Sequence, residues 1–321
     1  MTRRALLLAG LALAAGGAAR AQATGSTAGT LLALPATTRA LGFDGAYTGV
    51  VGDAGSVFVN PAGLAAIRSV ALETSYQAYL LDSYLVSVDG AVRVGRFDLG
   101  LGLNLMNYGS DTVYRPDPAY GGDRGIADPN GATAGAYSLE AVGAAVYRFG
   151  MFSVGASAKY LGDHLSIPDT TLYSASGVAF DAGAALAFFD IAALGVTVQN
   201  LGGDLKTNTG TPAPLPRTVR VGFSLNIVDP ENTPRLMVVG DWVSPRASRD
   251  YWVFGVEGGI VTDGVGVLGR LGVATGRAPT DQRSLVFGGS IVFHSLQIDY
   301  GYQGFSALGS GTSRIGLRWA P

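Results

Sequence analysis

Hydrophobic and polar residues alternate along most of the chain beyond residue 68. In residues 217–228, for example, Val219, Val221 and Phe223 alternate with Arg220 and Ser224. A period of two residues is typical of β-strands that have one apolar and one polar face. The pattern predicts 14 strands with turns or loops between them: 69–77, 81–94, 97–108, 136–149, 151–162, 175–189, 191–200, 217–228, 234–243, 250–262, 264–276, 283–293, 295–303 and 311–319.

The composition is unusual for a soluble domain. The 321 residues include 48 Gly, no Cys and only 14% charged residues, which makes the chain too apolar and too rich in glycine for that class. Without Cys there is no disulfide framework, thiolate metal site or lipidated N-terminal Cys. The net charge of −2 argues against nucleic acid as a partner.

Residues 1–21 have the three parts of a secretory signal peptide. Arg3 and Arg4 are followed by an apolar run over residues 5–15, and Ala19-Arg20-Ala21 is a cleavage site of the A-x-A type. The alternative, a transmembrane helix, needs a longer apolar run to span a bilayer. The sequence therefore predicts export from the cytoplasm.

The mature chain has no run of 18 apolar residues, so its route into a membrane is a closed β-barrel, in which every backbone group is paired. The spacing of the strands supports this interpretation. Most gaps after even-numbered strands are one or two residues, whereas 109–135, 163–174 and 201–216 are longer. Short periplasmic turns that alternate with longer outer loops are typical of bacterial outer-membrane barrels. We therefore expect outer-membrane lipid and the barrel assembly machinery as partners.

Charged residues are costly on the lipid-facing side of a barrel, so the charged positions of each strand are expected to face the lumen. Acidic and basic residues are nearly equal in number there, which favours internal ion pairs over a field of one sign. Many other inward positions are Gly, Ala or Ser, which leaves room for an inserted segment. The predicted lumen charges are Glu73, Asp89, Arg93, Asp98, Glu140, Arg148, Lys159, Asp181, Arg220, Asp241, Glu257, Arg270, Asp299, Arg314 and Arg318.

Residues 22–67 precede the strands, and we expect them to form a plug inside the barrel. Asn60 is suited to cap a short helix, and Pro61 is suited to its first turn. Such a helix, over residues 61–67, is too short to be stable alone and needs a host. The alternative is a simple turn outside the mouth of the barrel. The predicted plug motif consists of Asp53, Asn60, Pro61, Ala62 and Gly63.

The stretch Asn60-Pro61-Ala62-Gly63-Leu64 ahead of a β-barrel resembles FadL-like outer-membrane proteins. Within that group, Asn200-Leu201-Gly202 and the turn at Pro216 are similar to motifs of the PorV/PorQ family, as is the hairpin of residues 298–317. The resemblance implies a 14-stranded barrel over residues 68–321 with an N-terminal plug. FadL relatives pass hydrophobic small molecules, whereas PorV takes part in type IX protein secretion. The outer loops are short for a FadL-type transporter.

Catalytic and metal sites have little support in the sequence. Asp163, His164 and Ser166 could be imagined as a hydrolase triad, but a His in a loop, where we place His164, is more often a solvated polar residue. Asp117, Asp123, Asp128 and Asn130 could bind Ca²⁺ through oxygen atoms, but the Pro and Gly around them favour turn chemistry. We predict no enzyme activity, cofactor or metal.

Three functions are compatible with these patterns. The first is a plugged path for hydrophobic small molecules across the outer membrane, for which a lateral opening is one route. The second is a barrel of the PorV type that receives secreted proteins. The third is a structural barrel without cargo. An apolar pocket between plug and wall would favour the first, and an apolar patch on the outer loops would favour the second.

Overall fold

A computed structural model describes residues 29–79, 82–121, 124–168, 170–189, 191–228, 234–277, 283–305 and 310–321. The predicted signal peptide, residues 1–21, lies outside these ranges. Of the predicted plug segment 22–67, the structure describes residues 29–67. No helix in the described part of the chain is long and apolar enough to cross a membrane.

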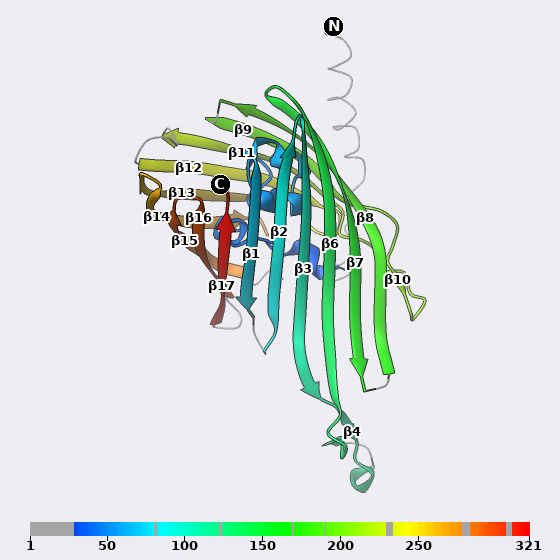
Figure 1. Cartoon of the computed structure of the whole chain (residues 1–321). Coiled ribbons are helices and arrows are strands. Elements are labelled where there is room, and N and C mark those ends of the chain that lie inside the picture. The colour runs from blue at the N-terminus through cyan, green and yellow to red at the C-terminus, as the bar shows by residue number, and fades with distance from the viewer. Residues whose placement is uncertain are drawn as a thin grey trace.

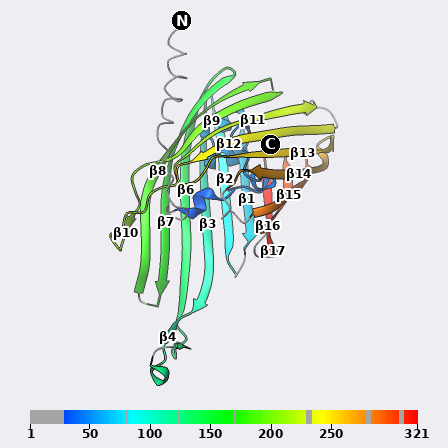
Figure 2. The same ribbon diagram turned by 180° about the vertical axis from the view of Figure 1, so that it is seen from behind.

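The chain forms a closed barrel of antiparallel strands with a small helical N-terminal segment inside it (Figures 1 and 2). The helical elements are η1 (Thr30–Ala33), α2 (Thr38–Gly42), η2 (Ala54–Phe58), η3 (Pro61–Ala66) and η4 (Pro118–Tyr120). The strands are β1 (Val70–Ala78), β2 (Tyr84–Val94), β3 (Phe97–Thr112), β4 (Tyr114–Pro116), β5 (Gly125–Ala127), β6 (Thr133–Phe149), β7 (Phe152–Ile167), β8 (Thr170–Phe188), β9 (Ala192–Leu201), β10 (Lys206–Thr207), β11 (Thr218–Val228), β12 (Pro234–Pro245), β13 (Tyr251–Thr262), β14 (Val265–Thr275), β15 (Arg283–Phe293), β16 (Leu296–Phe305) and β17 (Ser310–Trp319).

The main sheet has 15 described strands, of which β10 is a two-residue addition to the outer end of β8. The other 14 follow one another in chain order. The barrel closes where β1 pairs with β17, and β8 and β9 are paired as well. This confirms the predicted 14-stranded antiparallel barrel. Closure pairs the edge groups of every strand, which is what a membrane interior requires.

Polar and apolar residues that alternate in the sequence point to opposite faces of the barrel wall, the polar ones inward and the apolar ones outward. On β17, Arg314 is fully buried inside, whereas Ile315 and Leu317 are 62% and 44% exposed on the outer face. On β2, Ser87 and Asp89 are buried, and Val88 and Val92 are exposed. The outer face is thus a continuous apolar surface, as a lipid environment requires.

One predicted outer loop is wrong and another is shorter than predicted. The sequence pattern predicts a loop over 163–174, but β7 continues to Ile167 and β8 begins at Thr170. The predicted loop over 109–135 exists, but β3 continues to Thr112 and β6 begins at Thr133, with the small β4–β5 hairpin between them. The long strands β3, β6, β7 and β8 therefore project beyond the rest of the barrel (Figure 1). Gly, Ser and Thr are frequent in this projecting part, so its two-residue hydrophobic signal is weak.

Residues 29–67 run through the barrel lumen as η1, α2, η2 and η3, joined by turns. Three of these elements begin at a side-chain cap: Thr37 accepts from Ala40 N, Asp53 from Gly55 N, and Asn60 from Ala62 N. Such caps pair backbone donors that a short helix leaves free. The predicted helix after Asn60 exists as η3, a 3₁₀ helix over Pro61–Ala66.

Candidate passage and its plug

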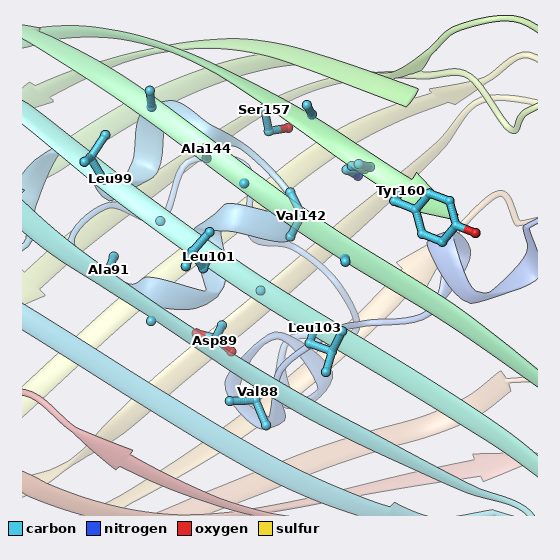
Figure 3. Close-up of a pocket in the computed structure, with 18 of the residues that line it drawn as sticks. Val88, Asp89, Ala91, Leu99, Leu101, Leu103, Val142, Ala144, Ser157 and Tyr160 are labelled. Atoms are coloured by element: carbon cyan, nitrogen blue, oxygen red, sulfur yellow. The ribbon is translucent and has the colours of Figure 1, made fainter. Parts of the chain in front are cut away.

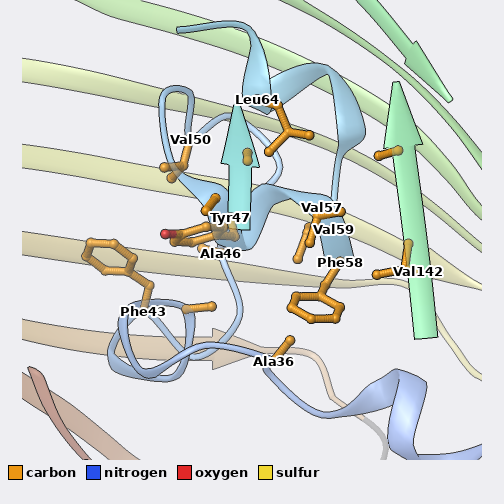
Figure 4. Close-up of a cluster of buried hydrophobic side chains, with 14 of the residues drawn as sticks. Ala36, Phe43, Ala46, Tyr47, Val50, Val57, Phe58, Val59, Leu64 and Val142 are labelled. Carbon is orange, nitrogen blue, oxygen red and sulfur yellow. The ribbon is translucent and has the colours of Figure 1, made fainter. Parts of the chain in front are cut away.

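The lumen is filled by the N-terminal segment, which we call the plug (residues 29–67). Its own apolar side chains form the largest buried cluster of the described chain, including Phe43, Tyr47, Val57 and Phe58, and Figure 4 shows them grouped against the wall. Val142 of β6 belongs to the same cluster. The plug and the barrel therefore share one hydrophobic core.

Glycines on the inner face of the wall make room for this cluster. A methyl group at Gly102 of β3 would lie 2.5 Å from Cζ of Phe58. One at Gly100 would lie 2.6 Å from Cδ1 of Leu64. Both distances are too short for carbon atoms, so the absence of a side chain lets the plug lie directly on the strand backbone.

Asn60 of the predicted motif connects three segments. Its Oδ1 accepts from Ala62 N at 3.2 Å, and its Nδ2 donates to the carbonyl of Thr48 at 2.9 Å and to Ala184 O on β8 at 3.4 Å. Beside it, Ser153 of β7 donates to the carbonyl of Ala62 at 3.1 Å. Asn60, Pro61 and Gly63 thus lie inside the barrel against the wall and not in a turn outside its mouth.

A buried ion pair holds the middle of the plug. Asp241 on β12 accepts from the backbone N–H groups of Tyr47 and Thr48, each at 3.1 Å, and from the Thr48 hydroxyl at 2.6 Å. Arg220 on β11 lies 2.8 Å from the same carboxylate and also donates to the carbonyl of Gly45. The Asp241 carboxylate on the wall therefore accepts hydrogen bonds from both the plug and the barrel.

Six charged side chains form a closed ring of ion pairs between plug and barrel. The plug supplies Arg39 and Asp53, and the barrel supplies Glu257 (β13), Arg270 (β14), Asp299 (β16) and Arg318 (β17). Going round the ring, the N–O distances are 3.2 Å for Arg39–Asp53, 2.8 Å for Asp53–Arg318, 3.2 Å for Arg318–Asp299 and 2.8 Å for Asp299–Arg270. Arg270 then pairs with Glu257, and Glu257 returns to Arg39 at 2.9 Å.

The two plug residues of this ring have shifted acid–base properties. Burial alone would raise the pKa of the Asp53 carboxyl, but Arg318 and Arg39 outweigh it and hold that pKa below its usual value. Burial alone would lower the pKa of Arg39, but Glu257 and Asp53 raise it above its usual value. Both groups are therefore charged across the physiological pH range, and the ring is electrically neutral.

Most other predicted lumen charges also lie in ion pairs. Lys159 contacts Asp181 at 2.9 Å and Glu140 at 3.4 Å, with all three side chains buried. Asp98 lies 2.8 Å from Arg148 and 3.4 Å from Arg93, which also donates to the plug carbonyl of Ala65.

Three lumen charges have no ion-pair partner within the described residues. Arg314 donates to Gln77 and to the plug carbonyl of Pro35, each at 2.8 Å. Glu73 and Asp89 receive no hydrogen bond from any side chain of the described chain.

The sequence motif around Asn200 lies at an irregularity in the wall. Asn200 has a left-handed backbone with φ of 58°, and the β8–β9 register shifts there. Its N–H donates to Asp181 at 2.8 Å and its side chain to the carbonyl of Pro216 at 3.0 Å. Beyond Leu201 and Gly202, the chain leaves the wall, and Leu205 and Leu215 pack against the inner face of β8. The motif therefore shapes the wall, because these hydrogen bonds join Asn200 to β8 and to the turn before β11.

The candidate catalytic and metal residues have structural roles. His164 lies in strand β7, opposite Tyr137, with ring centroids 5.2 Å apart. Asp163 accepts from Ser138 at 2.6 Å. Asp117 caps η4, and Asp128 accepts from Asn130 N and pairs with Arg115. Asp123 lies outside the described residues.

The outer face of the wall carries an apolar hollow of about 1440 Å³ across β2, β3, β6, β7 and β8 (Figure 3). Its floor consists of small residues such as Gly143 and Ala158, and Leu101, Tyr160 and Phe180 stand around it. The plug packs on the inner side of the same wall, where Phe58 and Leu64 meet Gly102 and Gly100. The apolar hollow is thus separated from the plug by one layer of strands.

Neither a scan against protein-family models nor a search of curated proteins found a match. Solved structures do match. The toluene transporter TbuX of Ralstonia pickettii has a TM-score of 0.59 at 14% identity, covering 89% of this chain and 98% of that one. The toluene transporter TodX of Pseudomonas putida gives 0.56 at 11%, covering 92% and 97%. A FadL homologue of Pseudomonas aeruginosa gives 0.55 at 14%, covering 88% and 98%.

These comparisons show the fold. The chain has the fold of the FadL-like barrels, over nearly the full length of each. At such low identity the likeness extends to architecture and not to cargo.

Proposed function

We propose that this chain is an outer-membrane channel that gives hydrophobic small molecules a gated path, with the plug as its gate. The observation that carries this proposal is the filled lumen. A barrel whose core is shared with residues 29–67 is no open pore, so passage requires the plug to move. Apart from its chain connection to β1, the plug is held in the barrel by hydrogen bonds, ion pairs and apolar packing, all of which can be broken reversibly.

The fold and the outer surface support the choice of cargo. The solved proteins of this fold named above are described as toluene transporters or as a FadL homologue. The outer face of the wall is apolar, and its hollow could receive a hydrophobic molecule on the lipid side. A lateral route through the wall would lead the molecule directly into the membrane, so it would not have to pass through water in the periplasm. No metal or cofactor is required for such transfer.

The test is uptake by cells that lack the native gene and carry either this chain or an empty vector. Uptake of a radiolabelled monoaromatic hydrocarbon and of a long-chain fatty acid should rise severalfold with the chain. Uptake of a small hydrophilic sugar serves as the control and should not rise. Equal uptake of both hydrophobic probes in the two strains would contradict the proposal.

One observation favours a second candidate, a barrel that receives secreted proteins. The β4–β5 hairpin lies beyond the ends of the long strands, and it exposes Tyr114 (65%) and Ile126 (42%). Exposed apolar residues of this kind can contact a protein partner. Deleting residues 114–127 should reduce the set of secreted proteins if secretion is the function and should leave hydrocarbon uptake unchanged. A full secreted profile in the gene-deletion strain would exclude this candidate.

A further inference from the structure

Two carboxylates face each other in the lumen without a counter-charge of their own. Glu73 on β1 and Asp89 on β2 are direct cross-strand partners, and each is 3% exposed. Side chains of such partners lie about 5 Å apart at Cβ. No side chain of the described residues donates a hydrogen bond to any of the four carboxylate oxygens.

The neighbouring arginine is already shared by two other acids. Arg318 is the cross-strand partner of Glu73 on the opposite side from Asp89. Its two Nη atoms pair with Asp53 of the plug and Asp299 of β16, and its Nε has no hydrogen-bond partner in the described chain. The ring of ion pairs therefore balances its own charges and leaves none for Glu73 and Asp89.

Ionising both acids would place two like charges opposite each other in a buried place, which is unfavourable. The cost would fall if Arg318 turned to Glu73. That turn would bring the unpartnered Nε of Arg318 to Glu73 and draw the guanidinium away from Asp53, so the contact between Arg318 and Asp53 would weaken. Asp53 belongs to the plug, so the partner exchange would loosen the plug at the ring.

From this geometry we propose that Glu73 and Asp89 form a proton-operated latch for the plug. With the pair protonated, Arg318 holds Asp53 and the plug is seated. When the pair loses protons, Glu73 competes with Asp53 for Arg318 and the plug is released. The inference rests on the proposed role of the plug as a gate, and it adds the signal that opens the gate.

The charged groups around the pair are consistent with this direction. From the plug, Asp53 is a charged neighbour of both acids, the phenol of Tyr47 faces Glu73, and Thr38 lies next to Glu73. From the wall, Arg318, Asp299 and Arg314 are the charged neighbours of Glu73, and Arg314 donates to Gln77 and to the plug carbonyl of Pro35. On β3, the residue opposite Asp89 is Gly102, which contributes no charge. Arg318 is thus the cation that lies directly opposite Glu73.

The test measures plug position directly. The chain contains no Cys, so spin labels can be placed at Ala66→Cys on the plug and Thr262→Cys at the end of β13, both exposed. The full chain in lipid vesicles is frozen at pH values from 5 to 9, and the distance between labels is measured. A second preparation carries Glu73→Gln and Asp89→Asn as well, and a third carries Asp163→Asn as an acid outside the plug seat.

We expect one label distance at pH 5 and a growing second population as the pH rises, with the ratio changing up to about tenfold per pH unit for each proton released. Glu73→Gln with Asp89→Asn should keep the single distance at every pH, whereas Asp163→Asn should follow the parent. A distribution independent of pH, or one unaffected by the double substitution, would overturn the latch. So would a distribution that followed added Ca²⁺ or Na⁺ at constant pH.

Plug position and cargo uptake are separate readouts. A plug that responds to pH in a chain that passes no hydrophobic probe would retain the latch and refute the proposed function. Uptake of the hydrophobic probes by a chain whose plug does not respond to pH would support the proposed function and refute the latch.

Discussion

Arg318 of the last strand lies 2.8 Å from the carboxylate of Asp53 in the plug. Because β17 closes the barrel against β1, this contact ties the N-terminal segment to the seam at which the two ends of the barrel meet. The ring of six charges extends the tie across β13, β14 and β16. The predictions below follow from the ring and from the other contacts of the plug.

Asp53→Asn should loosen the plug without preventing barrel assembly. The substitution removes two ion pairs and leaves Arg39 and Arg318 short of a counter-charge, a change that costs about 3–5 kcal/mol in buried pairs. We expect more frequent open events in single-channel recordings, with the heat-dependent gel shift of the folded barrel unchanged. A closed trace like that of the parent would show that the ring does not hold the plug.

Acid should release the plug through the same residue. The pKa of Asp53 is held below its usual value of about 4, so its stabilising contribution is complete above pH 4. It is lost as the pH falls further, through the lowered pKa. Conductance should therefore rise below pH 4 in the parent, and this acid limb should be absent from Asp53→Asn. The limb is distinct from the release that the Glu73–Asp89 latch predicts at high pH.

Asn60→Leu should permit normal insertion and alter passage. The loss of the cap costs about 1 kcal/mol, and the Thr48 carbonyl is left buried without its donor. The 14 paired strands do not depend on either contact, so the plug is the part that loosens. The readout is leak of a small solute from vesicles. Asn60→Asp is the matched control, because it keeps the cap oxygen and removes the Nδ2 donor; it should lie between the parent and Asn60→Leu.

Arg220→Glu should be more damaging than Arg220→Lys. It would place a second carboxylate beside Asp241, which is buried and 2.8 Å from the present guanidinium. We expect a lower unfolding midpoint in denaturant together with raised ion leak, since Arg220 also donates to the plug at Gly45. Lys at this position retains the charge and should recover most of the stability. Equal stability of all three proteins would mean that water, and not Asp241, neutralises Arg220.

The strands are predictable from the sequence wherever lipid faces one side. Val219, Val221 and Phe223 alternate with polar residues because one face of β11 is apolar and the other lines the plug. The outer ends of β7 and β8 contain many Gly, Ser and Thr residues, so residues such as His164 carry no such signal and resemble a loop in the sequence.

The candidate site is predictable only in part. The helix cap at Asn60 is local in sequence and can be expected from it. The ring cannot, because Arg39 and Glu257 are separated by 218 residues and meet only after the barrel has closed. Opposite charges on the inner face predict that pairs form, but the choice of partners depends on strand register and on how deeply the plug lies. That Glu73 and Asp89 have no ion-pair partner among the described residues can be recognised only when the partners of the other lumen charges are known.

The central claim is that passage requires the plug to move, and a reversible lock tests it most directly. A Cβ atom at Gly100 of β3 would lie 3.6 Å from Cβ of Val57 in the plug, which is within the range of a disulfide, so Cys at both positions in this Cys-free chain would join the plug to β3. Uptake of a radiolabelled hydrophobic probe should fall to the empty-vector level when the Val57→Cys, Gly100→Cys protein is oxidised and should return on reduction, with each single Cys variant insensitive to oxidation. Undiminished uptake by the fully oxidised protein would contradict the account.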